Sequence, residues 1–215
     1  MLNKNFTKPI THTLIIFCLM ISVVFAAGVA QKLQNPANVI RESISKLQSQ
    51  VKAEMHTDIS GENAGKLQSI VLKILLPYID IDFMATRTLG KKWRTASKAQ
   101  RQEFITQFSM MLVRTYSAAL LKVSSLDVKV FPMRGKSWMK KKVTIVNGQI
   151  INHDSGSVAN IAYYVQKSGN SWKIYDFAVE GIGFLNNFKE QFKQFATMQD
   201  LLKRIKKLNA ANSKS

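Results

Sequence analysis

His153, Asp154 and Ser155 are the residue types of a hydrolytic triad, and they occupy three successive positions of the chain. In a hydrolase the nucleophile, the base and the group that orients the base must converge in space, and adjacent residues of one turn cannot normally do so. The other histidines, His12 and His56, stand apart from them, and no set of histidine, cysteine and acidic positions has the spacing of a metal site. The sequence therefore predicts a protein that is not an enzyme and holds no metal or cofactor.

Two carboxylates, Asp176 and Glu180, flank the last strand that the sequence predicts, at 172–179, and are the acidic positions to test first. A buried or clustered carboxylate can serve a functional site. The simpler interpretation is structural, in which they cap the turn that follows or pair with a lysine or arginine.

The first thirty residues have the order of a cleaved export signal. Two lysines precede the apolar run 14–25, and the small-residue stretch 26–30 follows it. A run of about a dozen residues is shorter than the roughly 20 that span a bilayer. We therefore expect a signal peptide at 1–30, cleaved after Ala30, and a single domain at 31–215 that is exported to the periplasm.

Cleavage would remove Cys18, the only cysteine of the chain. A lipoprotein needs its cysteine at the end of the apolar run and after a small residue, whereas Cys18 lies within the run and follows Phe17. Without a thiol the mature chain can form no disulfide. Its stability must come from a packed core.

The chain is strongly basic, with 31 lysines and arginines against 13 acids, and the predicted mature part keeps 29 against 13, a net charge of +16. Because an exported protein rarely meets nucleic acid, the counterparts expected are anionic membrane surfaces or acidic proteins. A solubilising surface without a particular partner is the alternative.

Four helices are expected in the first part of the mature chain. Their apolar positions recur at helical spacing over 35–55, 67–75, 83–89 and, after a capping box at Ser97–Gln100, as far as Val123. The last of these is the longest, and its apolar stripe is wide. A wide stripe either packs on two partners or packs on one and lines a cavity.

Four strands rich in β-branched and aromatic residues follow, at 126–131, 141–152, 158–166 and 172–179. Short turns between them make the strands antiparallel, and helical spacing returns from Phe184, so the fold class is α+β. Asn147–Gly148 could turn a hairpin or form a bulge in one long strand, and we favour the bulge because a hairpin there leaves very short arms.

Three stretches carry a family resemblance: Leu75–Asp80, Leu89–Phe104 and Trp172–Ile182. In this order within one domain the chain resembles the MlaC, or toluene-tolerance, family of periplasmic phospholipid-binding proteins. The resemblance implies a helical layer wrapped on a twisted four-stranded antiparallel sheet, with a lipid pocket between them. It also implies a carrier that shuttles phospholipid between an outer-membrane complex containing MlaA and an inner-membrane ABC transporter whose MCE-domain component is MlaD, and so maintains outer-membrane lipid asymmetry.

The chain departs from the family after its Glu-Gly pair. Where the family commonly has Ser, Tyr and Arg, this sequence has Gly183, Phe188 and Lys189. The replacements keep an aromatic ring and a cation but remove two hydroxyl groups, so a hydroxyl contact to a ligand is not expected there.

A phospholipid carrier must enclose two acyl chains, because exposing on the order of thirty methylenes to water costs roughly 25 kcal/mol. We expect an apolar pocket near or above the upper end of the usual range of about 300 to 1,000 Å³. The alternative for any one wall residue is packing against protein. The predicted lipid-binding residues are Phe83, Phe104, Phe108, Met111, Leu112, Tyr116, Val143, Ile145, Tyr163, Val165, Tyr175, Phe177, Val179 and Ile182.

Basic segments could surround the lipid headgroup. Lys91, Lys92 and Arg94, or Lys140–Lys142, are candidates for such a rim, although solvated lysines are the simpler interpretation. The C-terminal segment 201–208 alternates leucine and isoleucine with lysine and arginine, so it either lies on a membrane or docks on the fold with a solvated face.

Two other functions are compatible with the sequence. A branch of the same family is associated with hopanoids, so the cargo could be a rigid polycyclic lipid. The chain could also be a basic module that binds membranes or acidic proteins without a ligand.

Overall fold

The computed structural model describes residues 32–54, 62–124 and 126–211. The chain divides into Met1–Lys32 and one compact unit, Leu33–Ser215. The signal peptide expected at 1–30 lies outside the described residues. Within the described ranges, none of the helices is long and apolar enough to span a membrane.

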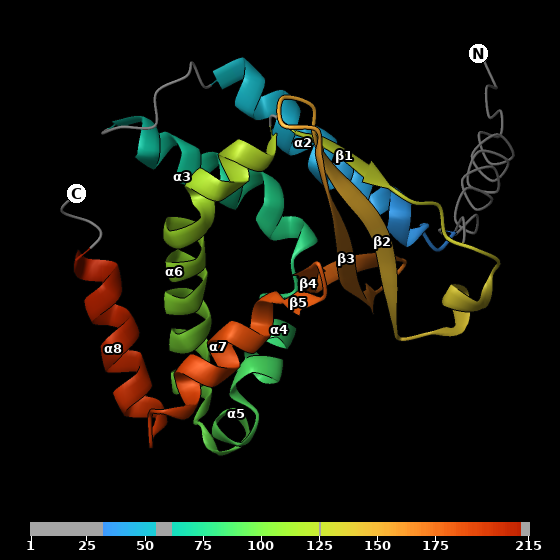
Figure 1. The fold of residues 1–215 in the computed structure, drawn as a ribbon. Helices are drawn as coiled ribbons and strands as arrows, with labels where there is room; N and C mark the ends of the chain where they lie inside the picture. Colours follow the sequence, from blue (N-terminus) through green and yellow to red (C-terminus); the bar gives the residue numbers. More distant parts are fainter. Residues whose placement is uncertain (1–31, 55–61, 125, 212–215) are drawn as a thin grey trace, which may run out of the picture. The chain divides into compact units, whose positions relative to one another are not determined.

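The first part of the compact unit is helical (Figure 1). Its α-helices are α2 (Pro36–Glu54), α3 (Glu62–Leu75), α4 (Ile81–Leu89), α5 (Lys91–Thr95) and α6 (Lys98–Ser124), with a 3-10 turn, η1 (Leu76–Tyr78), after α3. The four helices expected from the sequence are therefore present. The short helix α5 was not foreseen.

Side-chain caps fix where these helices begin. Asn35 accepts a hydrogen bond from the backbone N–H of Ala37 at 2.9 Å at the start of α2. Before α6, Ser97 and Gln100 form the predicted capping box, with reciprocal bonds of 3.2 and 3.0 Å. Such caps satisfy N–H groups that have no partner within the helix.

The second part forms an antiparallel sheet with the order β1-β2-β3-β4-β5. Its strands are β1 (Asp127–Val130), β2 (Val143–Asn152), β3 (Ser157–Ser168), β4 (Ser171–Val179) and β5 (Ile182–Gly183). Our expectation of four strands was wrong by one. The fifth has only two residues, and it returns from β4 through Glu180 and Gly181, whose φ angles of 49° and 79° suit a tight hairpin.

The bulge predicted at Asn147–Gly148 is absent from β2, which pairs with β3 in unbroken register from Val143 to Asn152. A bulge does occur, between β3 and β4 at Tyr164/Val165. Gly148 is needed for another reason: a Cβ atom there would lie 2.5 Å from the carbonyl oxygen of Lys129 on β1. The glycine permits close approach of two strands.

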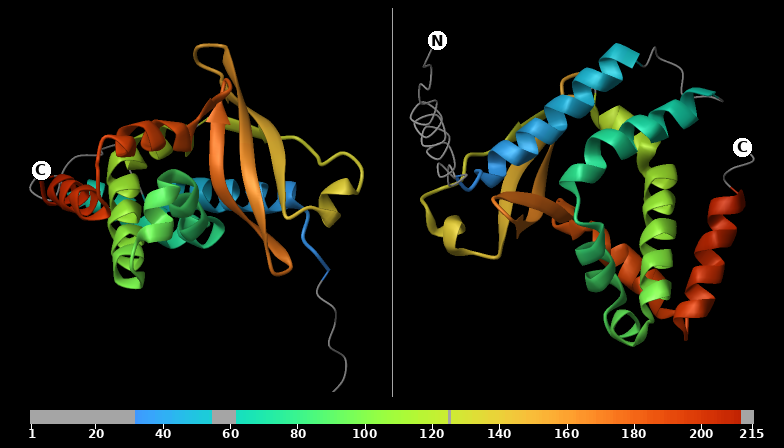
Figure 2. Two further views of the ribbon diagram at one scale, coloured as in Figure 1. Left: turned by 90° about the horizontal axis from the view of Figure 1, so that it is seen from below. Right: turned by 180° about the vertical axis from the view of Figure 1, so that it is seen from behind.

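The helices α6, α7 (Phe184–Lys193) and α8 (Met198–Ala211) lie on one side of the sheet, and the β1–β2 loop projects on the other (Figure 2). Phe104 and Phe108 of α6 are fully buried against Phe188 and Phe192 of α7. On α8 the residues Leu201, Leu202 and Ile205 are buried in the same cluster. The C-terminal helix is thus docked on the fold, which was one of the two possibilities left open by its sequence.

Substituting two glycines with different surroundings tests this packing. We expect Gly148→Ala to lower the free energy of unfolding by about 1 to 3 kcal/mol, because the added methyl group must push two strands apart. Gly65→Ala, in α3 with nothing within 4 Å of the new Cβ, should instead raise it by up to about 1 kcal/mol through helix propensity. Urea unfolding of both variants measures the difference, and a Gly148→Ala protein as stable as the wild type contradicts the close approach of β1 and β2.

The docking of α8 gives a second test. We expect Leu202→Ala to lower the free energy of unfolding by about 2 to 5 kcal/mol, because the side chain is almost completely buried. Leu208→Ala, at a half-buried position of the same helix, should lower the free energy of unfolding by a smaller amount. Equal and small losses in urea unfolding would mean that α8 does not contribute to the core.

Candidate functional site

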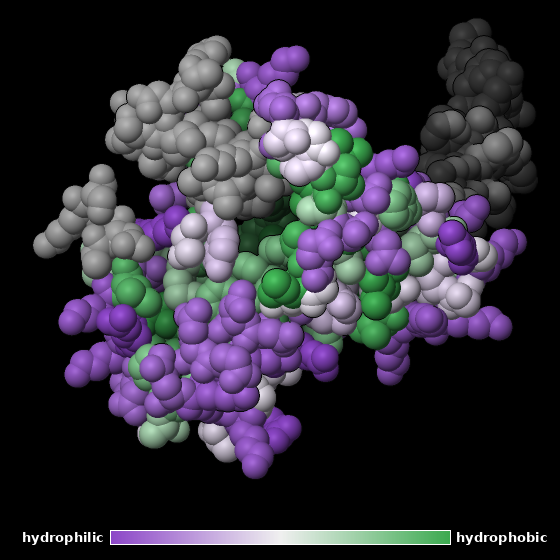
Figure 3. Space-filling model, viewed as in Figure 1, coloured by the Kyte–Doolittle hydropathy of each residue, from purple (hydrophilic) through white to green (hydrophobic). Residues whose placement is uncertain are grey.

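An apolar cavity of about 390 Å³ lies between the sheet and the helices α2, α3, α4 and α6. Figure 3 shows a hollow with hydrophobic walls near the centre of one face of the molecule. The residues that line the cavity are Ser43, Ile44, Leu47, Gln48, Val71, Leu72, Leu75, Leu76, Tyr78, Ile79, Ile81, Met84, Ser109, Leu112, Val113, Tyr116, Val128, Ile150, Ile161, Tyr163, Ile174, Tyr175, Asp176, Phe177, Val179 and Phe184.

Helix α6 separates the cavity from the packed core by means of two stripes. Ser109, Leu112 and Tyr116 follow one another at helical steps and face the cavity. Phe104 and Phe108 form the other stripe, stack on each other at 5.1 Å and pack against α7. The wide apolar stripe seen in the sequence therefore serves both purposes, a packed interface and a cavity wall.

The sheet supplies the opposite wall from four strands, β1 to β4. Ile161 and Tyr163 of β3 pair with Val179 and Phe177 of β4, so all four side chains lie on one face. Ile150 of β2 extends this wall toward the edge of the sheet. The regular alternation of the strands thus builds a continuous apolar floor.

Most polar side chains of the wall are already bonded to protein. Ser43 and Ser109 donate to backbone carbonyls one turn earlier in their own helices, at 2.8 and 2.7 Å. Gln48 donates to the carbonyl oxygen of Leu126 at 3.0 Å. Because these groups need no further partner, they add little polarity to the cavity.

Tyr163 differs from them, since no hydrogen bond of its hydroxyl group occurs among the described residues. Burial raises the pKa of Tyr163 to about 12. The phenol is therefore neutral at physiological pH. It is an uncharged donor beside an apolar space.

Asp176 is the only acidic residue among the cavity-lining side chains. Its carboxylate accepts hydrogen bonds from the backbone N–H groups of Phe177 at 2.8 Å and Leu185 at 3.1 Å. Burial raises the pKa of Asp176, and these bonds together with the charges of Lys189 and Arg87 offset part of the rise. The residue holds the start of α7 against β4, which is the structural role considered from the sequence.

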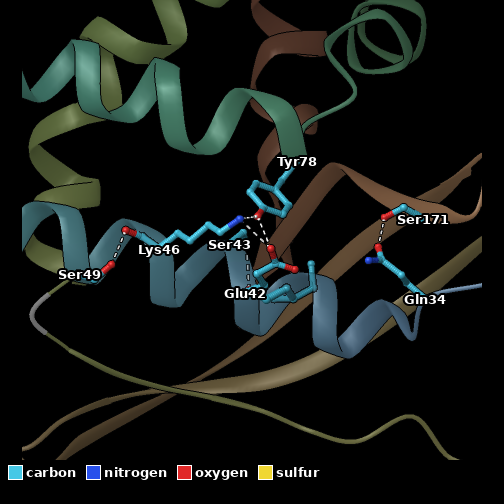
Figure 4. A network of polar contacts seen from close by, with 8 residues as sticks. Gln34, Glu42, Ser43, Lys46, Ser49, Tyr78 and Ser171 are labelled. Carbon is cyan, nitrogen blue, oxygen red and sulfur yellow. Dashed lines mark hydrogen bonds and ion pairs between the residues drawn. The ribbon is translucent and has the colours of Figure 1, made fainter.

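Two attachments hold η1 in place beside the cavity, and Figure 4 shows the first of them, between η1 and α2. Lys46 donates to the hydroxyl oxygen of Tyr78 at 2.8 Å and pairs with Glu42 at 2.7 Å, while Tyr78 donates to Glu42 at 2.9 Å. The hydrogen bond from Lys46 is the main reason that the pKa of Glu42 is lowered. Beyond η1, the backbone N–H of Asp80 donates to the carbonyl oxygen of Ile174 on β4 at 2.8 Å.

Six of the residues predicted from the sequence to bind lipid lie together on the cavity wall. They come from α6, β3 and β4, which face one another across the space. They are Leu112, Tyr116, Tyr163, Tyr175, Phe177 and Val179. Their contact with a lipid stays a prediction.

Five other predicted residues lie within packed protein. Phe104, Phe108 and Met111 face α7 and α8, because the stripe that they form is turned away from the cavity. Val165 is fully buried in a separate cluster with Trp138 and Trp172. Phe83 is half-buried, with its ring edge-on to Tyr175 at 4.8 Å.

The last three predicted residues point to solvent. Val143 and Ile145 are 43% and 46% exposed on β2, and Ile182 is 70% exposed on β5. Their apolar character suggested a wall position, but strand alternation places the β2 pair on the face opposite to the buried Val146. The basic segments considered for a headgroup rim, 91–94 and 140–142, are likewise absent from the cavity wall.

The wall residues that the sequence did not single out come from most elements around the cavity, and those of α2, α3 and η1 form a whole side of it. Ile44, Leu47 and Leu75 were recognised only as apolar positions of amphipathic helices. Their spacing could identify the buried face of each helix, but not whether protein or an open space lies opposite. The sequence therefore predicted that these residues are buried, but not that they line a cavity.

The cavity is smaller than expected. At about 390 Å³ it lies near the lower end of the usual range for ligand sites rather than near the upper end. The space does not extend along the first turns of α6, because Phe104 and Phe108 pack there against α7 and fill that region with protein.

The triad-like residues do not converge in the structure. His153, Asp154 and Ser155 lie in the exposed turn between β2 and β3, where Asn152 accepts hydrogen bonds from the N–H groups of Asp154 and Ser155. His153 faces Asp127 at 3.7 Å on the surface. Over the part of the chain that the structure describes, no three His, Cys, Asp or Glu side chains gather as a metal site.

Known proteins are similar to this chain in sequence and in fold. The chain is 26% identical to the toluene tolerance protein ttg2D of Pseudomonas putida over 160 residues, which cover 74% of this chain and 72% of that protein. It is 23% identical to the intermembrane phospholipid transport system binding protein MlaC of Haemophilus influenzae over 181 residues, 81% of this chain and 80% of that one.

Among solved structures, a phospholipid-binding protein from Ralstonia solanacearum, determined in complex with a phospholipid, superposes with a TM-score of 0.72. It is 23% identical in sequence, and the match covers 84% of this chain and 99% of that chain. The model of the MlaC protein family matches residues 41–210. The chain therefore belongs to the MlaC family.

Proposed function

We propose that this protein is a periplasmic phospholipid carrier whose cargo lies with its acyl chains in the cavity between the sheet and the helical layer. The observation that carries the proposal is the wall itself. It is apolar on both sides, and its serine and glutamine side chains are bonded to protein. A space of this kind stabilises hydrocarbon, whereas a charged ligand would lose most of its hydration there.

The relatives support the nature of the cargo. A protein of the same fold was solved with a phospholipid, and a second relative is named as the binding protein of an intermembrane phospholipid transport system. A cavity of about 390 Å³ would have to widen, or leave part of the cargo outside, to accommodate two acyl chains. The helices α2 and α3 are the elements whose movement would widen it, because they form one side of the wall.

Localisation and partners follow from the same proposal. Residues 1–30 act as a cleaved signal peptide, and residues 31–215 form the lipid-binding domain in the periplasm. There the carrier exchanges lipid with an outer-membrane complex containing an MlaA-like protein and with an inner-membrane ABC transporter that has an MlaD-like MCE-domain component. This traffic maintains the lipid asymmetry of the outer membrane.

The cargo is tested by analysing protein purified from its native source. We expect mass spectrometry of a lipid extract to find phospholipid in near-stoichiometric amount, because a wall of this kind shields acyl chains from water. Extraction of a hopanoid would replace the proposed cargo within the same fold. Folded protein that carries neither lipid would contradict the proposal.

The position of the cargo is tested by filling the cavity. We expect Val179→Trp, which adds an indole to the wall on β4, to reduce bound phospholipid by more than half. Val158→Trp is the matched control, because Val158 is 53% exposed on β3 and lies outside the cavity. Phospholipid per protein is measured for both folded variants, and equal lipid content would place the acyl chains elsewhere.

A further inference from the structure

The loop between β1 and β2 is longer than its connection requires. Residues 131–142 join two antiparallel neighbours, whereas hairpin loops usually have about two to five residues. Ordered loops of about a dozen residues without regular strands or long helices are commonly functional. None of these residues lines the cavity.

This loop is held by packed side chains. Trp138, in the 3-10 turn η2 (Ser137–Lys140), is buried, and its ring lies edge-on to Trp172 of β4 at 6.3 Å. Its indole N–H donates to the carbonyl oxygen of Gly135 at 3.1 Å, and the backbone N–H of Lys141 donates to the carbonyl oxygen of Trp138 at 3.1 Å. The exposed side chains of the loop therefore project from a fixed backbone.

Five of the exposed residues of the loop are cationic: Arg134, Lys136, Lys140, Lys141 and Lys142. No acidic residue occurs between Asp127 and Asp154. The backbone N–H of Lys167 donates to the carbonyl oxygen of Lys142 at 2.8 Å, which brings one more lysine from β3 to the loop. We call the resulting set the basic patch: Arg134, Lys136, Lys140, Lys141, Lys142 and Lys167, all exposed.

Among the described residues, no acidic side chain forms an ion pair with the basic patch. The ion pairs of the described residues lie elsewhere in the fold, and none includes a member of the patch. Like charges held together on a fixed backbone repel one another, and only an external anion relieves that repulsion. A simple solubilising surface would not need cations concentrated on one ordered loop.

Two exposed aliphatic side chains adjoin the patch. Val143 follows Lys142 directly, and Ile145 lies two residues further on the same face of β2. Figure 2 shows this loop on the side of the sheet away from α6, α7 and α8. Cations and apolar groups thus meet at this end of the sheet, where Val143 and Ile145 lie on the face opposite to Lys167, and none of these residues lines the cavity.

We propose that the basic patch, together with Val143 and Ile145, docks the protein on the surface of an anionic phospholipid bilayer. Five of its six cations are lysines, which act as point charges and do not need the fixed bidentate geometry that arginine forms with a carboxylate or a phosphate, so they suit a fluid surface of phosphate groups. Exposed valine and isoleucine side chains beside such cations can enter the boundary between headgroups and acyl chains. The inference goes beyond the carrier function and does not depend on the cargo.

The test measures partitioning of the full mature protein onto vesicles. We expect it to sediment with vesicles of equal parts phosphatidylglycerol and phosphatidylcholine, to stay in solution with phosphatidylcholine alone, and to dissociate as salt is added. Each lysine near such a surface contributes on the order of fivefold in partitioning. The partition coefficient of the combined variant Lys140→Glu, Lys141→Glu and Lys142→Glu on anionic vesicles should therefore be at least tenfold lower than that of the wild type.

A matched control separates the patch from overall charge. The control is the combined variant Lys91→Glu, Lys92→Glu and Arg94→Glu, which makes the same change of net charge on α5. We expect its partitioning onto anionic vesicles to fall by less than threefold. Val143→Ser with Ile145→Ser should weaken the binding that remains at high salt. Circular dichroism confirms that each variant is folded.

Two results would overturn the inference. Equal losses in the two triple variants would show that net charge alone acts, and failure of the wild-type protein to bind anionic vesicles would point to an acidic protein as the partner. The amount of bound phospholipid distinguishes failure of the docking inference from failure of the carrier function. The variant with glutamate at positions 140 to 142 should still contain as much bound phospholipid as the wild type.

Discussion

The fold depends on a constraint that acts against ordinary core packing: the helical layer must bury its own apolar side chains and still leave a space in front of the sheet. Helix α6 meets this constraint by carrying two apolar stripes. Phe104 and Phe108 pack against α7 and contribute the dense core that the domain needs. Leu112 and Tyr116 face the cavity, where contact with protein is incomplete.

Polar contacts attach the elements around that space to one another. The pair formed by α2 and η1 is joined through Glu42, Lys46 and Tyr78, and the segment after η1 is bonded to β4 through Asp80 and Ile174. Exposed polar contacts of this kind are individually weak. Together they fix the position of η1 relative to α2 and to β4.

The two faces of the sheet have different surroundings. One face forms the floor of the cavity with Ile161, Tyr163 and their neighbours on β4. On the other face Val143 and Ile145 are exposed beside an ordered cationic loop. Because adjacent residues of a strand point to opposite faces, Val143 and Ile145 are exposed while Val146 of the same strand is buried.

The sequence by itself determined the local features of this protein. Capping residues marked the start of α2 and α6, apolar spacing located the long helices, and β-branched runs located four of the five strands. These patterns involve residues close together in the sequence, so they can be recognised without knowledge of the fold. The two-residue strand β5 was missed because it is too short to show any alternation. The family resemblance also lies in contiguous stretches of the chain.

Only the tertiary structure decided which apolar residues face the cavity. Phe108 and Leu112 stand one turn apart on the same helix and are equally apolar, yet one is packed against α7 and the other lines the space. Periodicity gives the apolar side of a helix, but what lies opposite depends on where α2, α3 and α7 are placed by contacts distant in sequence. For the same reason the wall positions Ile44, Leu47 and Leu75 could be recognised as buried positions, and only the assembled layers showed that they border a cavity.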